Sequence, residues 1–131
     1  MNKFIPVALV TAFNPSLDYH MNDLRMKELA RHLRNNDLYP NAISRVVDED
    51  RTVPYYIVEV PNGSEEVYNK IWHYAQAFDM PSILGIDANQ KAFRIDINNE
   101  IKELQRVKAS SSIKTGSFMH ISNPKVYYIV E

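Results

Sequence analysis

The residues best suited to chemistry follow an apolar stretch near the start of the chain. Residues 4–13 are almost entirely hydrophobic, and Thr11, Asn14, Ser16 and Asn22 place hydroxyl and amide groups at or just after its end. Such groups can bind a small polar ligand, and the loop after a central strand is a favoured ligand site in open α/β sheets. The same residue types also stabilise turns and helix starts. The sequence therefore leaves two roles open: a ligand-binding site or a structural latch.

The spacing of these residues predicts that they converge. Pro15 restricts its own φ and favours an extended conformation for Asn14, so the loop should be stiff. Asn22 lies one helical turn before Met26, at the start of an apolar stripe. This places Asn22 on the inward face of a helix, near the end of the first strand. We expect Thr11, Asn14 and Asn22 to meet there, and the latch is the favoured role.

A second candidate for chemistry lies near the C-terminus. His120 and Ser122 form a His-x-Ser triplet that resembles half of a two-histidine phosphoesterase site. A second triplet would be needed, but His20, His32 and His73 are not followed by Ser or Thr at the matching position. A hydrolase is therefore the third hypothesis, and no catalytic residue is assigned.

Composition argues against most cofactors. The chain has no Cys, which excludes a disulfide framework, a thiolate zinc site and a cysteine nucleophile. Its three glycines are too few for a glycine-rich phosphate loop. Asp18 with His20, and the acidic residues 48–50, lack the spacing of a known metal motif. We expect neither a cofactor nor a metal.

Charge and hydropathy limit the classes of partner that the sequence favours. The net charge of −1 does not favour a polyanion as partner of the whole chain, although a local basic face remains compatible with it. Lys27, Arg31 and Arg34 form a basic row whose simplest role is a solvated helix face. No strand carries an RNA-binding aromatic signature, so nucleic acid is not expected. No apolar run reaches about 18 residues, and no signal peptide is evident, so we expect a cytoplasmic protein without a membrane span.

Consecutive tyrosines point instead to another protein as partner. In Tyr55-Tyr56 and Tyr127-Tyr128, one ring of each pair should face the core and the other should face outward. Tyrosine is enriched at protein interfaces. The leading hypothesis is a non-enzymatic interaction or regulatory domain, a class that includes phage-type inhibitors of host proteins. The alternative is a small-molecule or nucleotide-binding domain that uses the loop after the first strand.

The pattern of apolar residues predicts an α+β fold in a single domain of 131 residues. The order of elements favours a ferredoxin-like β-α-β-β-α-β sandwich over residues 1–97, followed by a C-terminal extension at 98–131. Residues 98–107 fit either a helix or a strand, and 108–116 should be a loop. The expected strands are 4–13, 41–47, 53–60, 82–86, 92–97 and a final hairpin of 118–122 and 126–130, and the expected helices are 22–35 and 64–78.

Residues 8–16, with the sequence ALVTAFNPS, resemble the hallmark of a family of small uncharacterised bacterial proteins, a domain of unknown function. Its members carry a strand that ends in Thr-Ala-aromatic-Asn-Pro, followed by an Asn that opens a Leu-rich helix. Asn22, Leu29 and Leu33 match this second part, and the resemblance extends over residues 5–97.

Two departures from the family pattern limit what the resemblance implies. The family tends to have an acidic residue before its third strand, where this chain has Thr52-Val53-Pro54. It also tends to have Gly-Gln after its second helix, where this chain has Asp79-Met80. The resemblance therefore implies a fold and a site, but no reaction.

Overall fold

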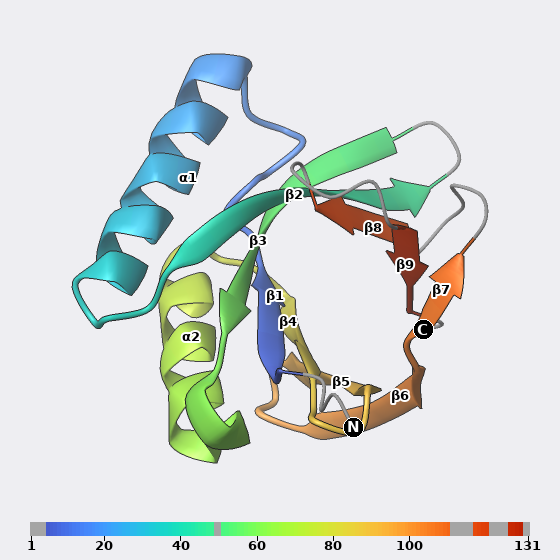
Figure 1. Cartoon of the computed structure of the whole chain (residues 1–131). Coiled ribbons are helices and arrows are strands. Elements are labelled where there is room, and N and C mark those ends of the chain that lie inside the picture. The colour runs from blue at the N-terminus through green and yellow to red at the C-terminus, as the bar shows by residue number, and fades with distance from the viewer. Residues whose placement is uncertain (1–4, 49–50, 111–116, 121–125, 130–131) are drawn as a thin grey trace.

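The computed structural model describes residues 5–48, 51–110, 117–120 and 126–129 (Figure 1). The helices are α1 (Tyr19–Arg34) and α2 (Glu65–Ala77), and a short 3-10 turn, η1, spans Pro61–Gly63. The strands are β1 (Val7–Val10), β2 (Pro40–Asp48), β3 (Arg51–Glu59), β4 (Ser82–Ile86), β5 (Lys91–Asp96), β6 (Ile101–Arg106), β7 (Lys108–Ser110), β8 (Ser117–His120) and β9 (Val126–Tyr128).

The described strands form one antiparallel sheet in the order β6-β5-β4-β1-β3-β2-β8-β9-β7. Both helices cover the same face of this sheet (Figure 1). The chain is therefore an α+β protein, as predicted. Among the described residues, neither helix is long and apolar enough to cross a membrane.

The structure decides the conformation of two segments in the C-terminal third. Residues 101–106, which fitted either a helix or a strand, form β6 because they pair with β5. Residues 108–110 were expected to be part of a loop, but they form β7 and pair with β9. The prediction of a loop was wrong at these positions because pairing with a distant strand outweighed the weak local preference of Lys-Ala-Ser for any structure. The turn of the expected final hairpin lies outside the described residues.

Helix α1 begins three residues earlier than expected. Asp18 is its N-cap, and its Oδ1 accepts a hydrogen bond from the Met21 backbone N–H at 2.8 Å. Asn22 is consequently inside the first turn, and Asp18, not Asn22, stabilises the helix start as its N-cap. Helix α2 has the expected N-cap, because Ser64 Oγ accepts from the Val67 N–H.

A first apolar core fills the space between the helices and the sheet. Leu29 and Leu33 of α1 and Ile71 of α2 are fully buried in it, with Val10 and Val58 of the central strands. These positions share the helical and alternating spacings of the sequence, which explains why they face inward. This cluster is called the helix-side core below.

A glycine in β4 lets an aromatic ring close the helix-side core at its edge. A Cβ built on Gly85 would lie 2.2 Å from Cζ of Phe93, its cross-strand partner on β5. The Phe93 ring therefore rests directly on the glycine backbone and meets the Tyr68 ring edge-on, with 4.9 Å between centroids. Glycine is required here by the close approach of the ring.

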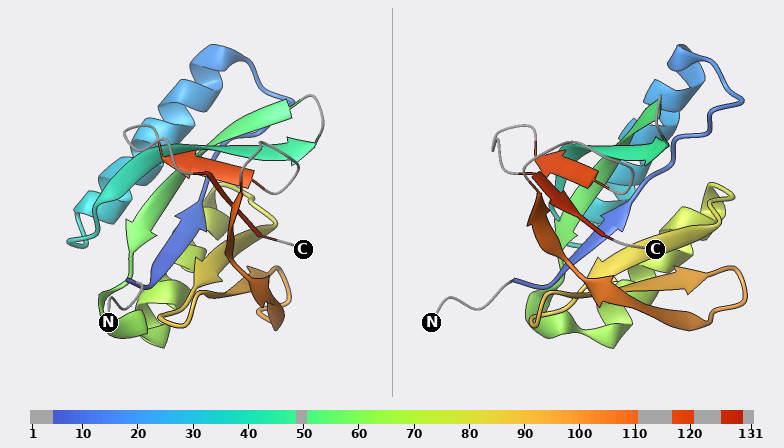
Figure 2. Two further views of the ribbon diagram at one scale, coloured as in Figure 1. Left: turned by 45° about the vertical axis from the view of Figure 1, so that its right-hand side comes forward. Right: turned by 90° about the vertical axis from the view of Figure 1, so that its right-hand side faces the viewer.

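A second core lies on the opposite face of the sheet, which curls. The outermost strands β6 and β7 are joined in the chain by Val107, so the two ends of the sheet come together (Figure 1, Figure 2). Leu9 of β1 and Ile43 of β2 pack there with Leu104, Val107 and Ile129. The C-terminal third thus supplies part of a core whose other side is the central strand. This cluster is called the concave core below.

Candidate functional site

Asn14 and Asn22 form a hydrogen-bonded latch between the loop after β1 and helix α1. The Asn14 backbone N–H donates to Asn22 Oδ1 at 2.8 Å, and Asn22 Nδ2 donates to the Asn14 carbonyl at 2.9 Å. Asn22 Nδ2 also donates to the Leu17 carbonyl at 3.2 Å. Asn22 is only 3% exposed, so its amide is buried but hydrogen-bonded through both heteroatoms. Asn22 thus fixes the shape of the loop.

Ser16 and Thr11 have separate roles around this latch. Asn14 Oδ1 accepts from the Ser16 N–H at 2.9 Å and from the Ser16 hydroxyl at 2.7 Å, which stabilises the turn. Thr11 Oγ1 donates to the Pro54 carbonyl of β3 at 2.7 Å and accepts from the Phe13 N–H at 3.0 Å. The structure therefore brings Asn14, Ser16 and Asn22 into one network, while Thr11 ties the end of β1 to β3. Ligand binding by these four residues stays a prediction.

Arg25 holds the same loop from the other side, a role that the sequence analysis missed. Its Nε donates to the Ala12 carbonyl at 2.7 Å and its Nη2 donates to the Phe78 carbonyl at 2.5 Å. The guanidinium carbon lies 5.4 Å from the centroid of the Phe78 ring. Arg25 is three residues after Asn22 and so lies on the same helical face, which was the available signal. Its contact at the end of α2 could not be read from that spacing.

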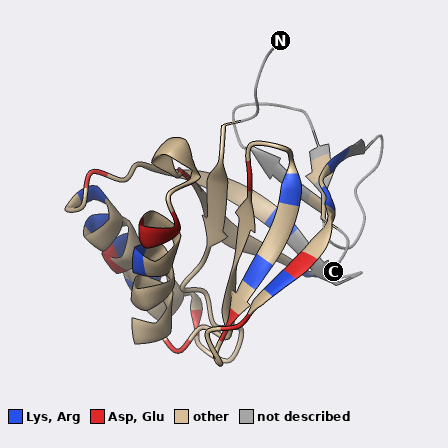
Figure 3. Ribbon diagram, turned by 90° about the horizontal axis from the view of Figure 1, so that it is seen from below, with Lys and Arg blue, Asp and Glu red and all other residues tan. Residues whose placement is uncertain are grey.

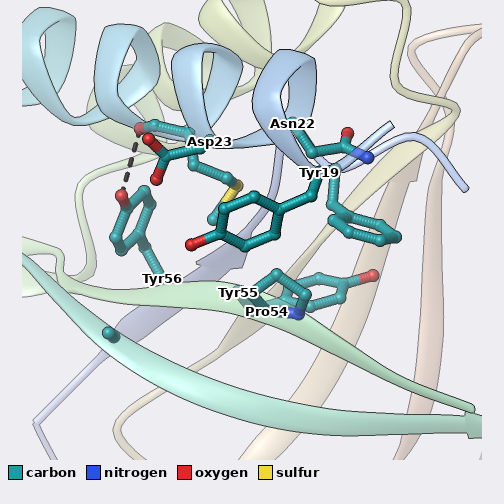
Figure 4. A pocket seen from close by; sticks show the side chains of 9 residues that line it. Tyr19, Asn22, Asp23, Pro54, Tyr55 and Tyr56 are labelled. Atoms are coloured by element: carbon teal, nitrogen blue, oxygen red, sulfur yellow. Dashed lines mark hydrogen bonds between the residues drawn. The ribbon is translucent and has the colours of Figure 1, made fainter. Parts of the chain in front are cut away.

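A groove of about 250 Å³ opens between α1 and β3, next to the latch (Figure 4). The Tyr19 side chain, which is 85% exposed, lies over it, opposite Pro54 of β3. The Asp23 carboxylate stands at its edge and forms an ion pair with Lys27 at 2.8 Å. The full lining is Phe13, Tyr19, Asn22, Asp23, Met26, Ala42, Pro54, Tyr55 and Tyr56.

The groove wall on β3 is made by the Tyr55-Tyr56 pair. Tyr56 packs against the helix-side core, and its hydroxyl donates to the Met26 carbonyl at 3.0 Å (Figure 4). Burial raises the pKa of the Tyr56 hydroxyl above its usual range. Tyr55 packs against the concave core, where the Arg45 guanidinium lies 5.5 Å from its ring centroid. Both rings are half-buried, so each faces one core and neither projects freely outward as expected for one of them.

The C-terminal candidates lie elsewhere. Tyr127 of β9 is half-buried against the concave core, and the side chain of Tyr128 is outside the described part of the structure. His120 ends β8 opposite Ile43, and Ser122 lies outside the described residues. Tyr55 and Tyr127 thus both pack against the concave core, from β3 and β9.

The lining of the groove is mainly apolar and aromatic. Across the residues that the structure describes, no group of three or more His, Asp and Glu side chains could hold a metal ion. The one carboxylate of the groove, Asp23, is already paired with Lys27. What remains is an apolar and aromatic surface beside a rigid loop.

Comparison with known proteins adds no relative to this picture. None of the protein-family models matches the chain, and no curated protein matches it.

Proposed function

We propose that this protein is a non-enzymatic interaction domain that binds a segment of another protein in the groove between α1 and β3. The observation that carries the proposal is an 85% exposed tyrosine, Tyr19, lying over an aromatic groove. Exposed aromatic rings beside a concave surface are typical of the residues that contribute most to protein interfaces. A phage-type inhibitor of a host protein is one form of such a domain, and the cytoplasm is its proposed location.

The size and chemistry of the groove favour an apolar or aromatic side chain of the partner as the occupant. Its volume of about 250 Å³ is below the range of about 300–1,000 Å³ found for pockets of drug-sized ligands. The Tyr56 hydroxyl and the Asp23 carboxylate are engaged within the protein. The groove therefore offers ring faces and edges more than free polar groups, and these suit a single anchoring side chain.

The alternative, a small polar ligand bound by Thr11, Asn14, Ser16 and Asn22, receives less support. Both heteroatoms of the Asn22 amide and the Thr11 hydroxyl bond to the backbone. A ligand would have to break bonds that hold the loop. These contacts favour the latch.

We also propose that the core of the fold is ferredoxin-like. The strand order β4-β1-β3-β2, with α1 and α2 each crossing over one strand, supports a ferredoxin-like core to which the remaining strands are added. The strand, the stiff loop and the Asn-bearing helix are also the features of the bacterial family that residues 8–16 resemble. We keep membership of that family as part of the proposal.

Selection from a displayed random-peptide library, followed by fluorescence polarisation with synthesised peptides, tests the function. Selected peptides should carry an aromatic or large aliphatic anchor. Tyr19→Ala should weaken their binding about tenfold, which corresponds to about 1.4 kcal/mol. Ala42→Trp, at an exposed lining position, should block the groove.

Tyr39→Ala is the matched control, because Tyr39 is 70% exposed and does not line the groove. It should leave peptide affinity unchanged. Equal losses for Tyr19→Ala and Tyr39→Ala would contradict the proposal. A nucleotide or metabolite that raises the melting temperature of wild type, but not of Asn14→Ala and Asn22→Ala, would favour the small-ligand alternative instead.

A further inference from the structure

The β5–β6 hairpin places positive charges directly opposite one another. In its register Lys91 faces Arg106, and Arg94 faces Lys102. Figure 3 shows how Lys and Arg are distributed over the described ribbon. Like charges at directly opposed positions destabilise a sheet, since their side chains are neighbours. Two such pairs in one hairpin disfavour folding of the isolated protein, and an anion bound between them would remove that cost.

These charges are weakly compensated by the protein. Within the described structure, the side chains of Arg94, Lys102 and Arg106 form no hydrogen bond or ion pair. Lys91 pairs with Glu103 at 3.0 Å. The other carboxylates of the hairpin are those of Asp87, Asp96 and Glu100. Asp87 Oδ1 and Asp96 Oδ1 each accept from backbone N–H groups of a turn.

The basic row on α1 is arranged differently, although it has similar residues. Lys27 pairs with Asp23, and Arg31 pairs with Glu28. Lys27 and Arg31 are therefore paired within α1, and their side chains are exposed. On the hairpin, residues 87–106 hold four Lys and Arg and four Asp and Glu. Its cations Arg94, Lys102 and Arg106 nevertheless form no ion pair within the described residues.

The surroundings of one charge pair can donate hydrogen bonds. A depression of about 690 Å³ at the end of the hairpin has no acidic residue in its lining. Its amides and cations are donors that suit phosphate oxygens. The lining consists of Asn89, Lys91, Leu104, Gln105, Arg106 and Lys108.

The two charge pairs lie on opposite faces of the β5–β6 hairpin. Ala92 packs in the concave core, so Arg94 faces the concave side and Lys91 faces the other side, since neighbours along a strand alternate. Strand β6 is the last strand of the sheet at this end. A hairpin with cations on both faces is complementary to the groove of a nucleic-acid duplex, which has a negatively charged phosphate strand on each side.

We infer that this β6 edge, through Lys91, Arg94, Lys102 and Arg106, binds the phosphate backbone of duplex nucleic acid. The major groove of a duplex is wide enough for a two-stranded ribbon and has a phosphate strand on each side. The hairpin's aromatic ring, Phe93, packs on Gly85 and is not available to stack on bases. Single strands are bound largely by such stacking, so a duplex is the favoured form. Binding should depend on charge and be independent of sequence.

Fluorescence anisotropy with a short labelled DNA duplex, titrated at several salt concentrations, tests this inference. Each phosphate contact contributes about 0.9 to the slope of log K against log salt. The double variant Arg94→Gln/Lys102→Gln should therefore reduce the slope by about 1.8. The control Arg31→Gln/Arg34→Gln changes the charge equally, on α1, and should leave the slope unchanged.

Three outcomes would overturn the inference: no binding of the duplex at about 50 mM salt, equal loss of slope in the α1 control, or tighter binding of the matching single strand. Competition by poly-glutamate as effective as that by unlabelled duplex would instead assign the edge to acidic proteins and would also overturn it. Removal of charge repulsion should keep or raise the melting temperature of the double variant at low salt. If that variant does not fold, the single variant Lys102→Gln, at an exposed position, should reduce the slope by about 0.9.

Discussion

The two faces of the sheet are packed in different ways. On the helix side, apolar side chains are accompanied by polar groups that bond to backbone carbonyls: Thr11 to Pro54, Tyr56 to Met26, and Tyr68 to Val7 and Ile86. The concave core is lined mainly by aliphatic residues contributed by strands far apart in the chain.

This difference shows which face of the sheet fixes the conformation of the loop beside the groove. Two of these groups lie near the end of β1, where the groove opens: Thr11 bonds to Pro54, and Tyr56 lines the groove. Tyr68 instead bonds at the start of β1. The concave core closes the sheet and buries its other face. We therefore expect substitutions in both cores to destabilise the whole protein, whereas substitutions of the polar groups should mainly affect the helix side.

The largest expected effect tests whether the two cores are one cooperative unit. Leu33→Ala in the helix-side core and Ile129→Ala in the concave core both remove side chains that are at most 1% exposed. Each should lower the free energy of unfolding by about 2–5 kcal/mol through lost burial and a residual cavity. Urea denaturation, followed by far-UV circular dichroism and tyrosine fluorescence, should give a single transition for each variant.

The exposed isoleucine Ile97, which is 66% exposed, provides the matched control. Ile97→Ala should change the free energy of unfolding by no more than about 0.5 kcal/mol. Two separate transitions, or no effect of Ile129→Ala, would show that the C-terminal third packs independently and that the concave core does not stabilise the rest.

An intermediate effect is expected for the latch on the helix side. Asn22→Ala leaves the Asn14 N–H without its partner and removes one of two donors to the Asn14 carbonyl, which also accepts from the Leu17 N–H. It should cost about 1–3 kcal/mol in the free energy of unfolding. Hydrogen exchange at the Asn14 amide should become faster, because that N–H donates to Asn22 in the native state. Asn36→Ala serves as control: its half-buried amide makes one bond, to the His32 carbonyl. An equal cost for both variants, with unchanged exchange at Asn14, would mean that Asn22 does not hold the loop.

The smallest effect concerns Tyr68 and depends on pH. Its buried hydroxyl lies 3.3 Å from the Val7 carbonyl and 3.1 Å from the Ile86 carbonyl, and Tyr68→Phe should cost about 1 kcal/mol in the free energy of unfolding at neutral pH. Burial, assisted by the charge of Asp87, raises the pKa of the Tyr68 hydroxyl. The unfolded chain ionises this group from about pH 10 while the folded chain keeps it neutral.

This difference in pKa determines how the stabilisation by Tyr68 changes with pH. The stabilisation from neutral Tyr68 is complete below about pH 10 and is lost as the pH rises towards the higher folded pKa. The cost of Tyr68→Phe should therefore shrink above that pH, as measured by urea denaturation across the alkaline range. Tyr39→Phe, which removes an exposed hydroxyl, is the control. A cost of Tyr68→Phe that stays constant with pH would show that burial does not raise the pKa.

Most of the secondary structure was determined by local sequence. The apolar stripe of α1, the Ser64 cap of α2 and the alternation in β5 each depend on residues close together in the chain, and periodicity detects them directly. The inward position of Asn22 followed from the same stripe. The start of α1 was missed because Tyr19 and His20 have no strong helix preference, so the Asp18 cap alone marked it.

The tertiary structure alone decided what covers each face and what the site contacts. Periodicity shows that a strand has an apolar face, but it does not say which distant segment packs there. The meeting of Ile129 with Leu9, the bond from Arg25 to Phe78 and the opposition of Arg94 to Lys102 all depend on strand order and register. Register is set by the simultaneous packing of many side chains across the sheet, and so it is a property of the folded chain as a whole.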